Sequence, residues 1–210
     1  MRYRGIFIAD GPSDLPLAGH LEALCLDHGA AVAITAVDPG LLRHTDRTVE
    51  GRLRFLVETE DRFDVVFVHR DAESQPPSDR RREVDDGVKR AGILVPVVPV
   101  VPVRMTEAWL LLDEQQIRNV AGWPSGRVGL DLPTPREAER LADPKQHLAN
   151  ALRAASGTSG RRLKVFQREF DRHRRTLLER LDRSGPINQL DAWQRLRLDV
   201  ESAVARIESS

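Results

Sequence analysis

The sequence contains little cysteine, little lysine and no long uncharged segment. Cys25 is the only cysteine among 210 residues, which excludes an internal disulfide and a zinc cluster built from cysteines. No stretch reaches the ~18 consecutive apolar residues of a transmembrane helix. Met1–Arg4 leads directly into strand-like residues, so we expect no cleaved secretion signal. The expected location is therefore the cytoplasm, without a membrane partner.

Two glycine-rich phosphate-binding motifs are also missing. Neither Gly-x-x-x-x-Gly-Lys nor Gly-x-Gly-x-x-Gly occurs in the chain. The loop after the first predicted strand carries Asp10 and Asp14 instead, and their charge repels a phosphate group unless a cation lies between them. A nucleotide-binding enzyme of either glycine-rich type is therefore disfavoured.

Charged residues are abundant and unevenly distributed. The 32 basic and 32 acidic side chains cancel, and 30% charged with 40% hydrophobic residues is typical of a globular protein. Residues 1–115 hold 14 basic against 20 acidic side chains, whereas residues 116–210 hold 18 against 12. All but three of the basic residues are arginine, whose planar fork suits phosphates, although a coding bias toward arginine is the simpler explanation. The acidic half is a candidate for metal binding and the basic half for binding a polyanion.

Short apolar runs alternate with helix-like stretches in the first half of the chain. We expect strands at Arg4–Ala9, Ala31–Val37, Phe63–Val68 and Ile93–Val103, with helices after Asp14, over Thr45–Glu58 and over Asp79–Ala91. This alternation predicts an α/β fold with a sheet of about four mainly parallel strands flanked by helices. The last strand repeats Val-Pro-Val three times, which predicts an edge strand because proline lacks a ladder donor; a polyproline recognition segment is the alternative.

The pattern after Thr106 is helical. We expect helices over Glu107–Val120, Pro135–Leu141, from Asp143-Pro144 onward, and over Arg161–Asp182 and Asn188–Glu208. The last two predict a C-terminal helical hairpin, which is also a candidate element for a homodimer. The expected division is therefore an α/β domain over residues 1–115 and a helical region over 116–210, packed on or beside it.

Five acidic residues follow the ends of predicted strands. They are Asp10, Asp14, Asp71, Glu73 and Glu107. Because ligands bind outside the carboxyl ends of parallel strands, we expect these side chains to converge on one edge of the sheet. Carboxylates that lie close together repel one another unless cations are present, and oxygen ligands suit magnesium. Two such ions can activate an attacking oxygen and stabilise a leaving one in phosphodiester cleavage.

Each acid also has a plainer interpretation. Asp14 suits a helix N-cap, Glu107 suits the positive end of a helix dipole, and Asp10 before Gly11 suits a turn. Arg70 is placed to neutralise one carboxylate without a metal. The pair Asp71 and Glu73 is the hardest to explain in these ways, because both residues follow an apolar strand and, if extended, share one face.

The order of these motifs resembles that of a known family. Asp10-Gly-Pro-Ser-Asp14 after a strand resembles the first motif of TOPRIM domains, Glu-Gly-x-x-Asp/Glu, and Asp71-Ala-Glu73 resembles their Asp-x-Asp motif. Thr106-Glu-Ala-Trp-Leu-Leu-Leu-Asp113 and Asp143-Pro-Lys-x-x-Leu148 are similar to the prokaryotic TOPRIM-related domain-of-unknown-function 4276 family. The resemblance spans residues 3–150 and extends distantly to the TOPRIM half of the overcoming-lysogenization-defect nucleases and to small TOPRIM proteins of anti-phage systems.

The resemblance implies a TOPRIM-like fold and a metal-dependent phosphoryl-transfer site. It places Mg²⁺ or Mn²⁺ on the five acids: Asp71 and Glu73 as metal ligands, Asp10 as ligand or base, and Asp14 and Glu107 at a second ion. Asp10, Asp71 and Glu73 form the implied catalytic set. Two departures stand out, because Asp10 occupies a glutamate position and Glu73 an aspartate position. These changes either compensate in reach or mark an inactive site.

The basic residues of the second half are candidate contacts to nucleic acid. Lys145, Arg161, Arg162, Lys164 and Arg168 are expected to follow a phosphate backbone, with a solvated helix face as the alternative. The leading hypothesis is a magnesium-dependent nuclease acting on DNA or RNA in anti-phage defence, with a partner ATPase or other defence protein as candidate partners. The second is a catalytically inactive accessory or sensor subunit that acts through protein or nucleic-acid binding.

Overall fold

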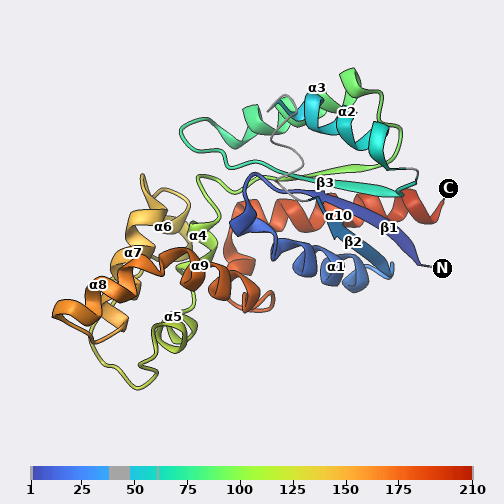
Figure 1. Ribbon diagram of the computed structural model, residues 1–210. Helices are drawn as coiled ribbons and strands as arrows, with labels where there is room; N and C mark the ends of the chain where they lie inside the picture. The colour runs from blue at the N-terminus through green and yellow to red at the C-terminus, as the bar shows by residue number, and fades with distance from the viewer. Residues whose placement is uncertain (1, 38–47, 61, 210) are drawn as a thin grey trace. The chain divides into compact units, whose positions relative to one another are not determined.

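A computed structural model describes residues 2–37, 48–60 and 62–209 (Figure 1). These residues form two compact units: unit 1 comprises Met1–Val101 and Gln194–Ser210, and unit 2 comprises Pro102–Trp193. The chain therefore changes unit after Val101, earlier than the expected boundary at residue 115. Most of the last helix belongs to unit 1, although sequence reasoning grouped it with the helical region.

Unit 1 contains the predicted α/β sheet. The four strands are β1 (Tyr3–Ile8), β2 (Val32–Ala36), β3 (Val65–His69) and β4 (Val97–Val100). They run parallel in the order β2-β1-β3-β4, with Ile8 aligned to Val68 and Val68 aligned to Pro99. The expected α/β class is confirmed, and within this sheet every pairing is parallel.

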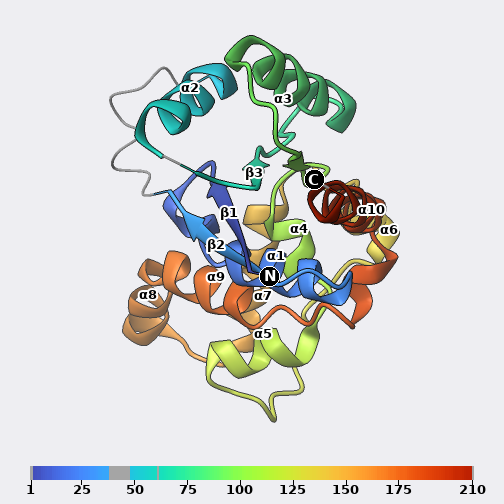
Figure 2. The same ribbon diagram turned by 90° about the vertical axis from the view of Figure 1, so that its right-hand side faces the viewer.

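Helices cover both faces of this sheet. They are α1 (Leu17–Asp27), α2 (Val49–Thr59), α3 (Pro77–Ala91) and the long α10 (Asp191–Glu208). Figures 1 and 2 show α2 and α3 over one face and α1 on the other, as in a doubly wound sheet. The Thr48 hydroxyl caps α2 by accepting from the Gly51 N–H, so this helix begins later than expected. Residues 45–47 of the expected helix lie outside the described residues.

The core between the sheet and helices α2 and α3 follows from strand alternation. Ile6 and Ile8 of β1 and Val66 and Val68 of β3 point to one face, where they pack against Val49, Leu53, Leu56 and Val84. Phe7 and Phe67, one residue out of phase, are fully buried as well, so both strands are covered on both sides.

Both edges of the sheet carry features that block further pairing. At the β2 edge, the Ile34 N–H donates to Glu22 Oε1 at 2.7 Å, so a side chain replaces a neighbouring strand. At the β4 edge, Pro99 lacks the donor that an added strand needs. The prediction that the Val-Pro-Val segment forms an edge strand is confirmed.

Unit 2 is helical. Its helices are α4 (Glu107–Leu110), α5 (Glu114–Ala121), α6 (Pro135–Ala138), α7 (Pro144–Ala155), α8 (Gly160–Arg168) and α9 (Phe170–Glu179). Two expected helices are interrupted. The first stops at Leu110, and Asp113 then begins α5 by accepting from the Gln116 N–H; in the second, Glu169 separates α8 from α9. The Trp109 and Trp193 rings pack edge to face with centroids 5.2 Å apart.

The two arms of the expected hairpin differ in their surroundings. The first arm consists of α8 and α9 in unit 2, whereas α10, the second arm, continues into unit 1, where Asp199 pairs with Arg81 of α3 at 2.8 Å. Within the described part of the chain, no helix is both long enough and apolar enough to cross a lipid bilayer.

Candidate functional site

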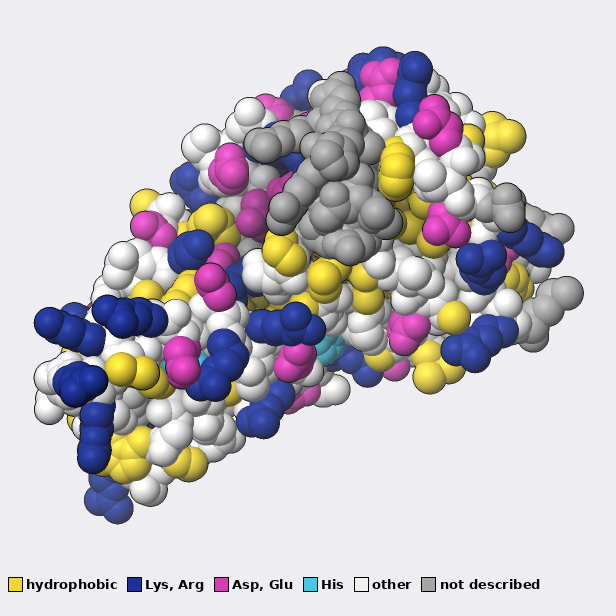
Figure 3. Space-filling model, viewed as in Figure 1, with side chains coloured by type: hydrophobic (Ala, Val, Ile, Leu, Met, Phe, Trp, Pro, Cys, Tyr) yellow, Lys and Arg dark blue, Asp and Glu magenta, His cyan; other side chains and the backbone are white. Residues whose placement is uncertain are grey.

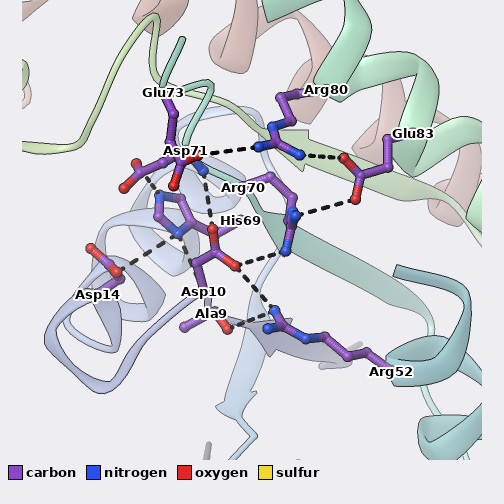
Figure 4. Close-up of polar contacts among 10 residues, drawn as sticks. All are labelled: Ala9, Asp10, Asp14, Arg52, His69, Arg70, Asp71, Glu73, Arg80 and Glu83. Carbon is purple, nitrogen blue, oxygen red and sulfur yellow. Dashed lines mark hydrogen bonds and ion pairs between the residues drawn. The ribbon is translucent and has the colours of Figure 1, made fainter. Parts of the chain in front are cut away.

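The carboxyl ends of β1 and β3 meet in unit 1 and bring three predicted acids together. Ile8 pairs with Val68 in the parallel register, so Asp10 and Asp71 leave neighbouring strands at the same edge. Asp14 reaches this edge from the short 3-10 helix Pro12–Asp14 that precedes α1. Figure 4 shows the three carboxylates around the imidazole ring of His69. The predicted convergence is therefore present for these acids.

His69 occupies the centre of this cluster and is fully buried. Its Nε2 lies 3.5 Å from Asp71 Oδ1 and its Nδ1 lies 3.9 Å from Asp14 Oδ2, so the two carboxylates approach the ring from opposite sides (Figure 4). The backbone N–H of Asp10 donates to Nδ1 at 3.4 Å. In the neutral ring this donor leaves the proton on Nε2, facing Asp71.

The charge state of His69 follows from two opposing effects. Burial disfavours the charged ring and lowers its pKa, whereas the hydrogen bond to Asp71 and the charges of Asp71, Asp14 and Asp10 raise it. The acids prevail, and the pKa of His69 lies above the ordinary value of histidine. The three carboxylates therefore favour the protonated form of the imidazole, which burial opposes.

Two arginine side chains hold the Asp10 carboxylate in place. Its Oδ1 accepts from Arg70 Nη1 at 3.0 Å and from Arg52 Nη1 at 3.3 Å. Its Oδ2 accepts the backbone N–H of Asp71 at 3.3 Å, which ties the two strand ends together. Both Asp10 oxygens therefore already have protein donors.

A second row of ion pairs extends outward from Arg70. Its Nη2 lies 3.2 Å from Glu83 Oε1, and Glu83 Oε2 accepts from Arg80 Nη1 at 2.8 Å. Arg80 also pairs with Glu73 at 3.5 Å. Glu73 has a φ of 53°, in the left-handed region, and its side chain is 64% exposed. The condition under which Asp71 and Glu73 would share one face, an extended chain, is not met, because the chain turns at Glu73.

The cluster combines many charges of both signs. Five carboxylates (Asp10, Asp14, Asp71, Glu73 and Glu83) meet three guanidinium groups (Arg52, Arg70 and Arg80) and the His69 ring. The edge of the sheet is therefore rich in carboxylate oxygen atoms that lie beside protein cations.

Glu107, the fifth predicted ligand, belongs to unit 2. It is the first residue of α4, and its Oε1 accepts from Arg174 Nε at 2.7 Å in a pair whose side chains are each 4% exposed. The plainer interpretation of Glu107, as a partner of the helix dipole, is incomplete. Glu107 also forms a buried ion pair with Arg174, which lies 67 residues away in the sequence. The carboxylate is already neutralised where it lies.

The alternative interpretation of Asp14 as the N-cap of α1 is wrong. The N-cap of α1 is Pro16, without a side-chain cap, and Asp14 lies in the preceding 3-10 helix with its side chain buried. Arg70 pairs with Asp10 and with Glu83, whereas the sequence argument placed it against one acid of the Asp71 and Glu73 pair.

Magnesium suits this edge by donor chemistry but not by the present arrangement. Asp10, Asp14 and Asp71 supply the hard oxygen atoms that Mg²⁺ binds. The His69 ring separates Asp14 from Asp71, and Arg52 and Arg70 occupy Asp10. Over the described ranges, no group of three or more histidine, cysteine or acidic side chains is arranged to hold an ion. Binding an ion therefore requires Asp10 to leave its arginines.

The predicted nucleic-acid contacts lie in unit 2. Lys145 is exposed in the first turn of α7, and Arg161, Arg162, Lys164 and Arg168 are exposed along α8. The Lys145 Nζ lies 5.9 Å from the centre of the Phe170 ring, in cation–π range. These side chains form a basic surface on one pair of helices.

Sequence reasoning missed four members of the cluster, namely His69, Arg52, Arg80 and Glu83. His69 shares the strand phase of Val65 and Phe67, so a polar residue at this inward position was a usable signal. Arg52 follows the buried Val49 by one helical turn, which places it on the side of α2 that faces the sheet.

Comparisons of the chain with protein-family models, with curated proteins and with solved structures find no match.

Proposed function

We propose that this protein is a divalent-metal-dependent phosphoryl-transfer enzyme, a nuclease that cleaves DNA or RNA phosphodiesters. The observation that carries the proposal is the meeting of three acids at the carboxyl edge of the sheet: Asp10 and Asp71, which follow two adjacent parallel strands, and Asp14 of the 3-10 helix. The motif order that resembles TOPRIM domains agrees with this placement. The carboxylate oxygens of these acids are the hard ligands that a divalent cation such as Mg²⁺ binds.

In this proposal Asp10, Asp14 and Asp71 hold the metal. A bound Mg²⁺ lowers the pKa of a coordinated water and stabilises charge on a phosphoryl oxygen. His69 holds the Asp71 carboxylate in place, which is the usual task of a polar partner behind a metal ligand. Arg70 and Arg80, which lie beside the acids, supply positive charge for a phosphate group. Glu107 is left out of the ligand set because Arg174 neutralises it.

The ion pairs also favour a second candidate function. Arg52 and Arg70 bind Asp10, and Arg80 binds Glu73, so protein cations already offset part of the acidic charge. If these ion pairs never open, the acids cannot bind a metal ion. The protein would then be a catalytically inactive accessory or sensor subunit that acts through a bound partner. The two functions differ in one respect: in the nuclease the acids release their arginine partners and bind a metal ion, and in the inactive subunit they do not.

Cleavage assays separate the two candidates. We expect the wild-type protein to cleave single- or double-stranded DNA or RNA with Mg²⁺ or Mn²⁺ and to lose activity in EDTA. Asp71→Asn should lower the rate by more than about 100-fold, since even groups behind a metal ligand are worth 10–100-fold. Asp85→Asn, a charge-matched change on the exposed side of α3, should leave the rate unchanged. Cleavage without metal, or equal rates in both variants, would overturn the nuclease proposal.

A further inference from the structure

Unit 2 contains a small cavity bounded by α7, α8 and α9. Its volume is about 240 Å³, and Gln146, Asn150, Phe166, Gln167, Phe170 and His173 contribute to its walls. Pockets for drug-sized ligands usually measure ~300–1,000 Å³. A cavity below this range suits one planar group rather than a large ligand.

Aromatic rings form one side of this cavity. Phe166 stacks on His173 with centroids 4.2 Å apart and planes inclined by 26°, and both Phe166 and Phe170 are only half-buried. None of the nine residues of α8 is fully buried. The apolar side of this helix is therefore only partly covered, which leaves aromatic surface available for stacking.

Polar groups surround these rings. The Asn150 Oδ1 accepts from Gln146 Nε2 at 3.2 Å, so the two amides are held in one orientation, and the Gln167 amide lies on the opposite helix. His173 is 6% exposed, and its Nδ1 has no hydrogen-bond partner among the residues that the structure describes. A buried polar atom of this kind is costly unless a partner arrives.

Basic side chains neighbour the residues that line this cavity, and together they are called the basic rim. Lys145 lies against the Phe170 ring, and Lys164 and Arg168 are exposed on α8. Figure 3 shows Lys and Arg side chains gathered over the part of the surface where Figure 1 places α8. Lys164 and Arg168 lie about one helical turn apart on α8, and Lys145 adds a third positive charge from α7.

We propose that this cavity binds a nucleobase of single-stranded nucleic acid. Rings of this type stack on the flat face of any base, amides pair with base edges, and the basic rim neutralises the adjoining phosphates. An acidic peptide would use the basic rim but leave the rings without a partner, and an uncharged aromatic molecule would not use the rim. The inference deepens the proposed function, on which it rests for the substrate class, by naming how unit 2 holds the strand.

The state of His173 agrees with a base as the ligand. Burial, together with the neighbouring Arg172, lowers the pKa of His173 despite the opposing charge of Glu169. The ring is therefore neutral at neutral pH. In the tautomer that carries its proton on Nε2, the buried Nδ1 is an acceptor for the amino group of a base.

The test measures binding in EDTA, so that cleavage does not contribute. A fluorescent single-stranded oligonucleotide, the same oligonucleotide with abasic sites, and free nucleoside monophosphates are titrated against the full chain. We expect the base-containing strand to bind about 5- to 150-fold more tightly than the abasic strand, as one stacked base provides. Equal affinity for the two strands would overturn the proposal, and mononucleotides that bind as tightly as the strand would overturn the assignment to a strand.

Matched variants locate the contact. Phe170→Leu keeps apolar volume but removes the ring, so it should erase the preference for the base-containing strand while abasic binding is unchanged. Phe55→Leu, which alters a half-buried phenylalanine of unit 1, should keep the preference. A wild-type preference in Phe170→Leu contradicts the proposed site. Base-dependent binding without cleavage would disprove only the nuclease chemistry, whereas cleavage without base preference would disprove only the cavity.

Discussion

At the scale of single residues, the site depends on how each acid is neutralised. Asp10 is held by two guanidinium groups, whereas Asp14 and Asp71 share one buried imidazole. Removing a partner from a buried charge costs more than the pair itself contributes, because the remaining charge loses its water and its counter-ion together. Loss of the His69 ring should therefore remove a partner from two carboxylates at once.

The pH dependence of folding tests this role of His69. Its folded-state pKa is raised, so its contribution to stability is fully present below the unfolded value of ~6.5 and is lost as the pH rises through the folded value. In EDTA, the free energy of unfolding of wild type minus that of His69→Gln should therefore shrink as the pH rises above about 6.5. Urea unfolding at a series of pH values measures this difference.

A control uses His28, which lies at the C-cap of α1 outside the acid cluster. His28→Gln should not reproduce the pH trend of His69→Gln. A wild-type advantage over His69→Gln that grows with pH would mean that burial outweighs the acids and that the ring is held neutral.

Sequence reasoning identified Asp10, Asp14 and Asp71 because strand ends are visible in the pattern of apolar residues. It did not identify their partners, since Arg52 reaches Asp10 only after α2 packs on the sheet. The Glu107–Arg174 pair likewise joins residues whose proximity depends on the packing of α4 and α9. Residue types at strand ends are readable from sequence, but contacts made by tertiary packing are not.

At the scale of elements, the strands and most helices of unit 1 follow from periodicity and caps. The errors fall where one residue interrupts a pattern. Asp113 lies within an otherwise helical pattern and was missed as the N-cap of α5, and Glu73 turns the chain where the sequence argument considered an extended pair. Both residues are types that sequence patterns allow in several conformations, so neighbouring structure decides.

The packing of α3 against α2 gives a prediction at this scale. A Cβ at Gly87 of α3 would lie 2.8 Å from Val49 Cγ1 and 3.1 Å from the Glu50 N, so Gly87→Ala should destabilise the protein by about 1–3 kcal/mol. Helix propensity alone predicts the opposite sign, a gain of about 1 kcal/mol. Thermal or urea unfolding of the variant decides between the two effects.

Gly19 of α1 supplies the matched control. A Cβ there would meet nothing within 4 Å, so Gly19→Ala should keep or raise stability by up to about 1 kcal/mol. Stabilisation by both changes would show that α2 and α3 do not approach as closely as described.

At the scale of the whole molecule, the uneven charge of the sequence corresponds to two different sites. The acidic first half supplies the cluster at the edge of the sheet in unit 1, and the basic second half supplies the rim of the cavity in unit 2. We propose that unit 1 carries out the phosphodiester cleavage and that unit 2 binds the single-stranded nucleic acid. This division requires that the acids of unit 1 exchange protein cations for a metal ion.

Calorimetric titration of the metal-free protein with Mn²⁺ tests this exchange most directly. We expect saturable binding to wild type and to Asp85→Asn, and loss of binding in Asp71→Asn. No binding to wild type, or equal binding by all three proteins, would contradict a metal site at this edge of the sheet.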